Sequence, residues 1–272
     1  EVLRVAGTCG CAVPLAETLL AGWLLQKAGI TMPMGAMAAA PNRAGVRIEV
    51  SNDGTLSGTA RRVPFAGAVG QLVVVARQGE TDHVALVSAA DCRIKVGASI
   101  AGDPIGDVDF AGLVPTQIVS VPNAVDDLHK LGAAARSAMI AGALEAALGI
   151  SVQYAQERKA FGRNIGGFQA VQHNLSRLAC EAAAAAAASR SAADAINTAE
   201  GLSGDEMLLE VAGAQVRCGQ AAGQGAAIAH QAPGAIGFNA GHLLHRFTTR
   251  PFAGPAGYGT DNERSVPPGQ TA

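Results

Sequence analysis

The pattern of hydrophobic residues changes period once along the chain, near residue 120. Before that point, apolar and β-branched residues form short runs separated by turn residues such as Asn52, Asp53 and Gly54. The runs lie at residues 46–50, 56–60, 72–76, 83–87, 92–96, 108–110 and 117–121. From residue 124 onward, alanine and leucine recur with helical spacing. Strands followed by helices, without alternation, predict an α+β fold that begins with an antiparallel β-barrel or sandwich.

Four helices are predicted after the strands. Asp126 and Asp127 suit the start of the first, because carboxylates are stabilised near a helix N-terminus. The predicted helices span residues 128–158, 168–198, 204–230 and 241–247. Alanine favours helix but has little side-chain area, so the second helix, which includes residues 182–188, must lie close to its neighbours. These lengths and short connections predict a four-helix bundle.

The N-terminal segment contains one further predicted helix. It begins near Pro14, has apolar residues at helical spacing through Leu24, and ends near Gly29. A single amphipathic helix cannot form a core alone, so it must pack on another part of the chain. The chain starts at Glu1 without a signal-peptide pattern, and we expect a processed or truncated start.

Composition excludes some classes of partner. Twenty basic and 22 acidic residues give a net charge of −2, which offers no electrostatic basis for binding nucleic acid or an anionic membrane. No run reaches the roughly 18 to 20 uncharged apolar residues of a membrane span. The five cysteines and the histidines at 230, 242 and 245 lack metal-ligand spacing. We expect a cytoplasmic protein with reduced thiols, whose histidines lie at helix ends or an interface.

The connection between the first two bundle helices, residues 154–172, is the strongest candidate for a site. Arg158 offers a fork of donors that suits a phosphate, and the aromatic ring of Phe161 can cover an adenine or ribose. Gly162 and the pair Gly166 and Gly167 allow the backbone to approach a ligand. The alternative interpretation is an ordinary polar connection between helices.

This stretch resembles the acyl-CoA dehydrogenase family, in which a Tyr-x-x-x-Arg-x-x-Phe-Gly segment followed by Phe-Gln leads into the C-terminal bundle. The resemblance implies that Arg158, Phe161 and Gln169 bind the diphosphate and adenosine end of an FAD held mainly by a neighbouring subunit. The Asp-Gly-x-Leu-x-Gly phrase at residues 53–58 resembles the family's middle β-domain. It implies three regions: a remnant of the N-terminal helical domain (1–42), the β-domain (43–122) and the bundle (123–272).

A second segment, after the third bundle helix, resembles the family's Gln-x-x-Gly-Gly-x-Gly loop along the same arm of FAD. Gln231, Gly234 and Gly237 match, whereas Ala235 replaces the second glycine. A glycine-rich helix end is the alternative interpretation. Further along, the resemblance also implies FAD contact for Thr260.

Other family positions are not kept. Residues 32–41, where the family has a polar loop against the flavin ring, offer no Thr, Ser or Asp side chain. Tyr258 stands at the position of the family's catalytic glutamate, and a phenol of ordinary pKa near 10 is a poor base at neutral pH. The second base position known in the family falls on Gly132. Asp261 or Glu263 could supply a displaced carboxylate.

The resemblance therefore implies a non-catalytic subunit of a hetero-oligomeric, FAD-dependent acyl-CoA dehydrogenase of the steroid-degradation type. A homologous catalytic subunit, in an α2β2 assembly, would hold the flavin ring and the acyl-CoA, with electron-transfer flavoprotein or a similar acceptor. Two alternatives remain: a complete homo-oligomeric enzyme with a displaced base, and a structural relative that binds no flavin.

Overall fold

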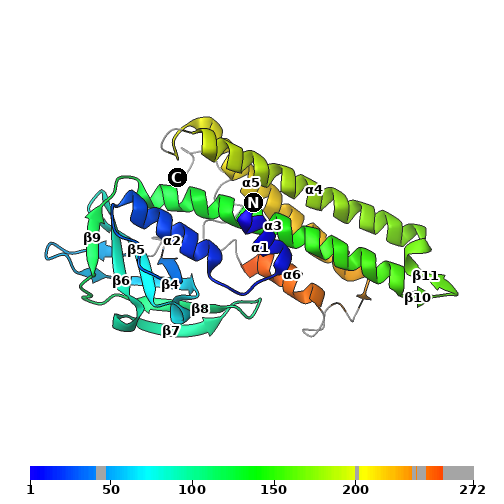
Figure 1. Cartoon of the computed structure of the whole chain (residues 1–272), viewed down its shortest axis with the longest axis horizontal. Helices are drawn as coiled ribbons and strands as arrows, with labels where there is room; N and C mark the ends of the chain where they lie inside the picture. Colours follow the sequence, from blue (N-terminus) through cyan, green and yellow to red (C-terminus); the bar gives the residue numbers. More distant parts are fainter. Residues whose placement is uncertain (41–46, 200–201, 235–236, 238–242, 254–272) are drawn as a thin grey trace, which may run out of the picture. The chain divides into compact units, whose positions relative to one another are not determined.

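The computed structural model describes residues 1–40, 47–199, 202–234, 237 and 243–253 (Figure 1). The chain divides into two compact units. The helical unit comprises Glu1–Cys11 and Ala133–Ala272, and the β unit comprises Ala12–Gly132. The division falls inside helix α3 (Ala124–Glu157), whose first turns belong to the β unit.

The β unit contains two sheets, in agreement with the predicted β-barrel or sandwich. Within the described residues, the larger sheet has the order β3-β2-β5-β6-β9, with β1 also paired to β5, and the smaller sheet has the order β4-β8-β7. The strands are β1 (Met37–Ala40), β2 (Glu49–Val50), β3 (Leu56–Ser57), β4 (Thr59–Pro64), β5 (Gln71–Gln78), β6 (Thr81–Ser88), β7 (Arg93–Ala98), β8 (Pro104–Asp109) and β9 (Gln117–Ser120).

The prediction of antiparallel pairing is confirmed for most of these strands, and β1 is the main exception. It pairs in parallel with β5, from Met37 opposite Gln71 to Ala40 opposite Val74. The prediction of a loop over residues 32–41 was wrong for Met37–Ala40. These four residues are buried, and Thr18 hydrogen-bonds both the N–H and the C=O of Met37 at 3.1 Å. A strand that is buried on both faces, between the sheet and a helix, does not need alternating apolar and polar residues.

That helix is α2 (Leu15–Lys27), which packs on β1 and β5. Its buried residues include Leu20, Leu24 and Leu25. The amphipathic helix was predicted to pack on another part of the chain, and that part is the sheet. On the other face of the sheet, Leu56, Leu72 and other apolar residues form a closed core that includes Phe110.

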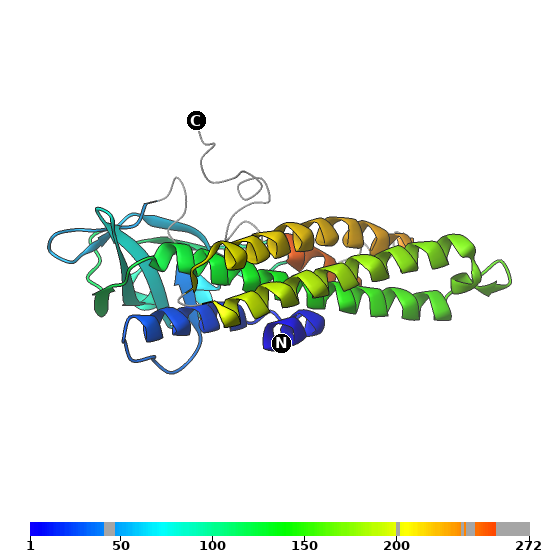
Figure 2. The same cartoon turned by 90° about the horizontal axis from the view of Figure 1, so that it is seen from above.

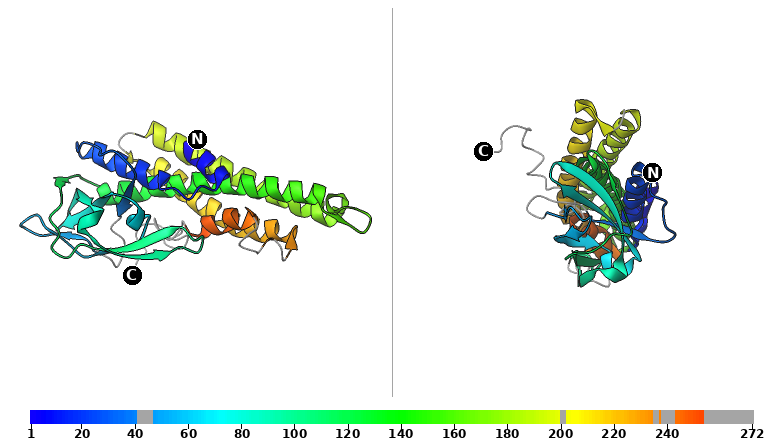
Figure 3. Two further views of the ribbon diagram at one scale, coloured as in Figure 1. Left: turned by 60° about the horizontal axis from the view of Figure 1, so that its bottom comes forward. Right: turned by 90° about the vertical axis from the view of Figure 1, so that its left-hand side faces the viewer.

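The helical unit contains α1 (Val2–Cys9), α4 (Gln169–Thr198), α5 (Asp205–Gln231), α6 (Leu243–Ala253) and most of α3, as Figures 2 and 3 show. The helices predicted after residue 124 are confirmed, although α6 extends six residues beyond its predicted end at Phe247. The core between α3, α4 and α5 consists largely of small side chains, including Ala141, Ala185 and Ala221. Close approach of helices through alanine therefore follows the prediction.

Helix α3 is long and apolar enough to span a membrane by length and composition alone. Nearly half of its most apolar stretch, 44%, is buried inside the protein, and Ile140 and Leu144 lie in the core shared with α4 and α5. A core helix of a bundle has the same properties.

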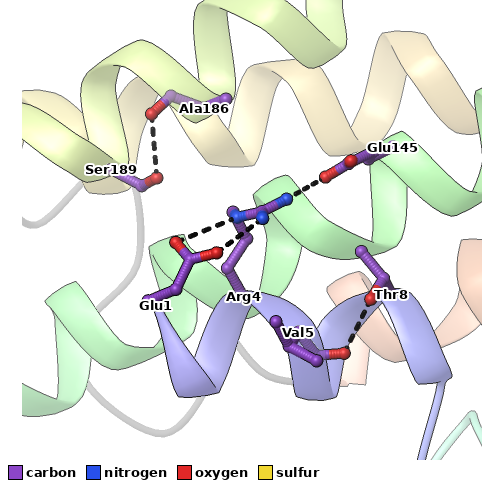
Figure 4. A network of polar contacts seen from close by, with 7 residues as sticks. All are labelled: Glu1, Arg4, Val5, Thr8, Glu145, Ala186 and Ser189. Atoms are coloured by element: carbon purple, nitrogen blue, oxygen red, sulfur yellow. Dashed lines mark hydrogen bonds and ion pairs between the residues drawn. The ribbon is translucent and has the colours of Figure 1, made fainter.

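Helix α1 crosses α3 at two glycines. A Cβ on Gly142 would lie 2.0 Å from the carbonyl oxygen of Arg4, and one on Gly7 would lie 2.2 Å from that of Met139. Beside this crossing, Arg4 forms ion pairs with Glu1 and Glu145 (Figure 4). Because these ion pairs are partly exposed, the glycine contact is the more specific feature of the crossing.

We expect Gly142→Ala to destabilise the chain by about 1 kcal/mol, at the lower end of the range for overpacking because α1 can shift away as a unit. Gly149→Ala on the same helix is the matched control. Nothing lies within 4 Å of its added Cβ, and alanine should stabilise α3 there by about 0.5–1 kcal/mol. Denaturant unfolding of both variants measures the difference, and equal effects would contradict the close crossing.

Burial separates the five cysteines into reactive and unreactive thiols. Cys9, Cys11 and Cys180 are exposed, whereas burial raises the pKa of Cys218 to about 12 and that of half-buried Cys92 to about 11. Since the thiolate is the reactive form, iodoacetamide at pH 8 should label the three exposed cysteines of the folded chain first. Mass spectrometry after partial labelling tests this order, and early labelling of Cys218 would contradict the α4–α5 packing.

Candidate functional site

The connection between α3 and α4 forms a tight β-hairpin, a structure that the sequence analysis did not predict. Strands β10 (Lys159–Ala160) and β11 (Arg163–Asn164) pair antiparallel around Phe161 and Gly162. Both central residues have positive φ, 53° and 80°, which defines a two-residue turn of the type I′ kind. The turn explains Gly162 directly, whereas a phenylalanine at positive φ is uncommon and costs free energy.

The Phe161 side chain is 95% exposed. Its ring meets that of Phe168 edge-on, with centroids 6.1 Å apart and an interplanar angle of 89°. The Arg163 guanidinium lies 4.2 Å from the Phe168 ring centre. Neither the backbone conformation nor solvent exposure favours phenylalanine at this position, so its ring is available to a ligand or a partner.

Hydrogen bonds fasten the hairpin to the ends of both helices. The N–H of Ile165 donates to the C=O of Arg158 at 2.9 Å, and the Asn164 amide donates to the C=O of Gln156 at 2.6 Å. On the other side, the Gln172 amide donates to the C=O of Gly166 at 2.9 Å. Arg158 and Phe161 are therefore presented on a fixed support, and the polar connection between the two helices has the regular structure of a hairpin.

The second predicted segment reaches the same end of the bundle. Gln231 is the last residue of α5, and its side-chain oxygen accepts a hydrogen bond of 2.8 Å from the Asn174 amide in the second turn of α4. Gln169 begins α4, and Gly234 follows α5 with a φ of +60°. We call the group formed by Arg158, Phe161, Gln169, Gln231 and Gly234 the hairpin-end site.

Positive charge prevails around the hairpin-end site. Among the described residues, its exposed ionisable neighbours along the chain are Glu157, Lys159, Arg163, His173 and Arg177. The side chains of Arg158, Phe161, Gln169 and Gln231 are all exposed. The guanidinium and the two amides are hydrogen-bond donors that fit a diphosphate, and the aromatic face can stack on the adenine of a dinucleotide. The residues present thus fit the adenosine–diphosphate end of FAD.

The other predicted positions contribute differently. Gly132 is buried inside α3 and offers no carboxylate as a base. Tyr258, Thr260, Asp261 and Glu263 lie outside the described residues, as does Ala235. Between residues 32 and 40, Met34 is 99% exposed while Met37–Ala40 are buried in β1. No group of three or more possible metal ligands occurs in the part of the chain that the structure describes.

Three residues that support the hairpin-end site were given no role of their own from the sequence. The Phe168 ring meets Phe161 edge-on and carries the Arg163 guanidinium over its face, and Asn174 holds Gln231. The spacing of Phe168 from Phe161 was visible in the sequence, but its meaning depends on the reversal of the chain at the turn. The Asn174 contact joins residues 57 positions apart, and no local pattern encodes it.

Comparison with known sequences defines the class of protein. Residues 129–263 match the family described as "Acyl-CoA dehydrogenase, C-terminal domain". These residues contain the hairpin-end site and the bundle helices that support it. This part of the chain, residues 129–263, belongs to the acyl-CoA dehydrogenase family.

Particular relatives extend this result. The chain is 33% identical over 164 residues to acyl-CoA dehydrogenase FadE34 of Mycobacterium tuberculosis (strain ATCC 25618 / H37Rv). That match covers 57% of this chain and 22% of the relative, so the chain corresponds to about a fifth of that protein's length.

Several solved structures match this chain over both its sheets and its helical bundle. The ChsE4-ChsE5 complex from Mycobacterium tuberculosis matches with a TM-score of 0.84 and 22% identity, over 97% of this chain and 77% of that chain. A Tcur3481-Tcur3483 steroid ACAD variant matches with a TM-score of 0.85, 22% identity and the same coverages. Glutaryl-coenzyme A dehydrogenase matches at 0.80 and 19% identity, over 97% and 75%. At these identities the likeness establishes the fold.

Proposed function

We propose that this chain completes the FAD site of a catalytic partner subunit in a hetero-oligomeric acyl-CoA dehydrogenase. One observation carries the proposal: Arg158, Phe161 and Gln231 stand exposed at one end of the bundle, on supports that hold them in place. A ligand bound there would have a second side open to another subunit. The residues that the family uses to hold its cofactor arm across an interface are present, and those for proton abstraction are replaced at Tyr258 and Gly132.

In this complex, Arg158 would bind the FAD diphosphate, and Phe161 would cover the adenine. Gln169 and Gln231 would donate amide hydrogen bonds to the same arm, Gly234 would let backbone approach it, and Thr260 would add a hydroxyl. Bound FAD would supply hydride acceptance for oxidation of a Cα–Cβ bond in an acyl thioester. The flavin ring, the acyl-CoA and the carboxylate that removes the α-proton would belong to the partner.

The assembly that we propose is α2β2 and cytoplasmic, with an electron-transfer flavoprotein or similar acceptor. Two solved structures of the same fold are named as complexes or pairs, ChsE4-ChsE5 and Tcur3481-Tcur3483, and the latter is called a steroid ACAD. These names favour a heteromeric assembly and a ring-bearing, steroid-derived acyl group.

The alternative is a homo-oligomeric dehydrogenase whose base is Asp261 or Glu263. Replacing each carboxylate with its amide distinguishes this alternative from the completing-subunit proposal. The completing-subunit proposal predicts unchanged turnover of the complex for both variants, and loss of turnover by several orders of magnitude would favour the alternative.

The experiment that tests the proposed function is purification of this chain alone and together with candidate partners encoded beside it. Flavin absorbance and native mass are measured for each preparation. We expect flavin in the mixed complex and little or none on the chain alone. A full complement of flavin on a homo-oligomer of this chain would overturn the proposal, as would a mixed complex without flavin.

A further inference from the structure

His230, the residue before Gln231, occupies a position that its helix alone does not explain. It lies in the last turn of α5 and was predicted to be a helix-end or interface histidine. The structure places it in the bundle interior at 8% exposure. Its Nε2 lies 2.9 Å from the hydroxyl oxygen of Thr248 in α6, which is itself only 5% exposed.

The Thr248 hydroxyl lies between the imidazole and its own helix. The hydroxyl oxygen lies 3.2 Å from the C=O of Leu244 and 3.3 Å from that of His245. The hydroxyl therefore joins Nε2 of His230 to α6 by a hydrogen bond. Nδ1 lies on the opposite side of the imidazole ring.

That opposite side meets the segment that follows Gln231. A Cβ built on Gly237 would lie 3.1 Å from Nδ1 of His230 and 2.5 Å from Cγ of Pro233. The backbone at Gly237 therefore passes so close to the imidazole and the proline ring that only glycine fits. The imidazole fixes the distance between this backbone and α6, because Thr248 holds its other edge.

Gln231 and Gly237 are thus each held by a neighbouring helix. Asn174 in α4 holds the side chain of Gln231. Gly237 rests against His230, which Thr248 in α6 holds. Gly234, which follows α5, has a φ of +60°. A shift of α6 would therefore be transmitted through the imidazole to Gly237.

We propose that His230 and Thr248 are positioning residues that hold the backbone at Gly237, close to the end of α5 that carries Gln231, for contact with the adenosine–diphosphate arm of FAD. This role rests on the function proposed above. Neither residue touches the cofactor in this assignment. Their contribution is to fix the distance between Gly237 and α6.

The test uses the co-purified mixed complex and a matched pair of substitutions at residue 248. Thr248→Val keeps the shape of the side chain but removes the hydroxyl that hydrogen-bonds Nε2 of the buried imidazole, and Thr248→Ser retains a hydroxyl. Release of FAD from the complex is followed by the rise in flavin fluorescence. We expect release to be about 5-fold to 30-fold faster for Thr248→Val and within about 2-fold of the wild type for Thr248→Ser.

Val211→Ala controls for a general loss of stability, because Val211 is fully buried near the start of the same helix, α5, far along it from His230. Hydrogen exchange gives a readout independent of FAD: the end of α5 should exchange faster in Thr248→Val but not in Val211→Ala. FAD release no faster in Thr248→Val than in Thr248→Ser and Val211→Ala would overturn the positioning role alone. A wild-type complex without flavin would overturn the proposed function and this role with it.

Discussion

Replacing Arg158 with alanine is expected to weaken FAD retention in the mixed complex by about 1.5–3 kcal/mol, which is about 10-fold to 150-fold in the dissociation constant. The Arg158 side chain is exposed, and its C=O is held by the N–H of Ile165, so removing the side chain leaves the hairpin itself in place. The loss then reports a charge-assisted contact with the diphosphate and not a folding defect. Equilibrium dialysis of FAD against the complex gives the dissociation constant.

Two further variants define the origin of this effect. Arg158→Lys keeps the charge but not the fork of donors, and an intermediate loss is expected if the diphosphate is bound by two parallel hydrogen bonds. Arg190→Ala removes an equally exposed arginine more than halfway along α4, and retention should not change. Equal retention in Arg158→Ala and the wild type would mean that this arginine does not bind the cofactor, and would favour the structural relative that binds no flavin.

The period of the hydrophobic pattern was sufficient to predict most secondary structure. Each strand-like run and each alanine-rich segment corresponds to an element of the structure, because alternation and helical spacing are local properties. The main error was β1, where Met37 and three alanines carry neither signal. Their strand conformation results from burial between β5 and α2, and that is a tertiary property.

The residues of the candidate site were proposed from the sequence, but their arrangement could not be. The motif residues Arg158, Phe161 and Gln231 were identified from spacing and family resemblance, and the structure brings them to one end of the bundle because α4 and α5 are antiparallel and similar in length. The hairpin depends on Phe161 adopting positive φ, which sequence statistics disfavour. His230 and Thr248 are 18 residues apart, and only the packing of α6 relates them.

Phe161→Asn is expected to separate stability from function at the tip of the hairpin. Asparagine before glycine is the preferred sequence of a type I′ turn, so the strain of a phenylalanine at φ 53° should be relieved and the free energy of unfolding unchanged or raised by up to about 1 kcal/mol. Loss of the exposed ring should nevertheless weaken FAD retention in the complex by about 1–3 kcal/mol, the range for stacking of a base on an aromatic side chain. Denaturant unfolding of the chain and dialysis of the complex measure the two quantities.

Phe161→Tyr is the matched control, because it keeps the aromatic face and the unfavourable backbone conformation, and its retention of FAD should remain close to that of the wild type. The opposite outcome for asparagine, a loss of stability without a loss of FAD, would mean that the ring serves mainly to pack against Phe168, 6.1 Å away. A strained and fully solvated aromatic side chain is costly to a free chain. It becomes favourable only when a partner or a ligand covers it, and a substitution that improves the turn while removing the ring distinguishes these two states.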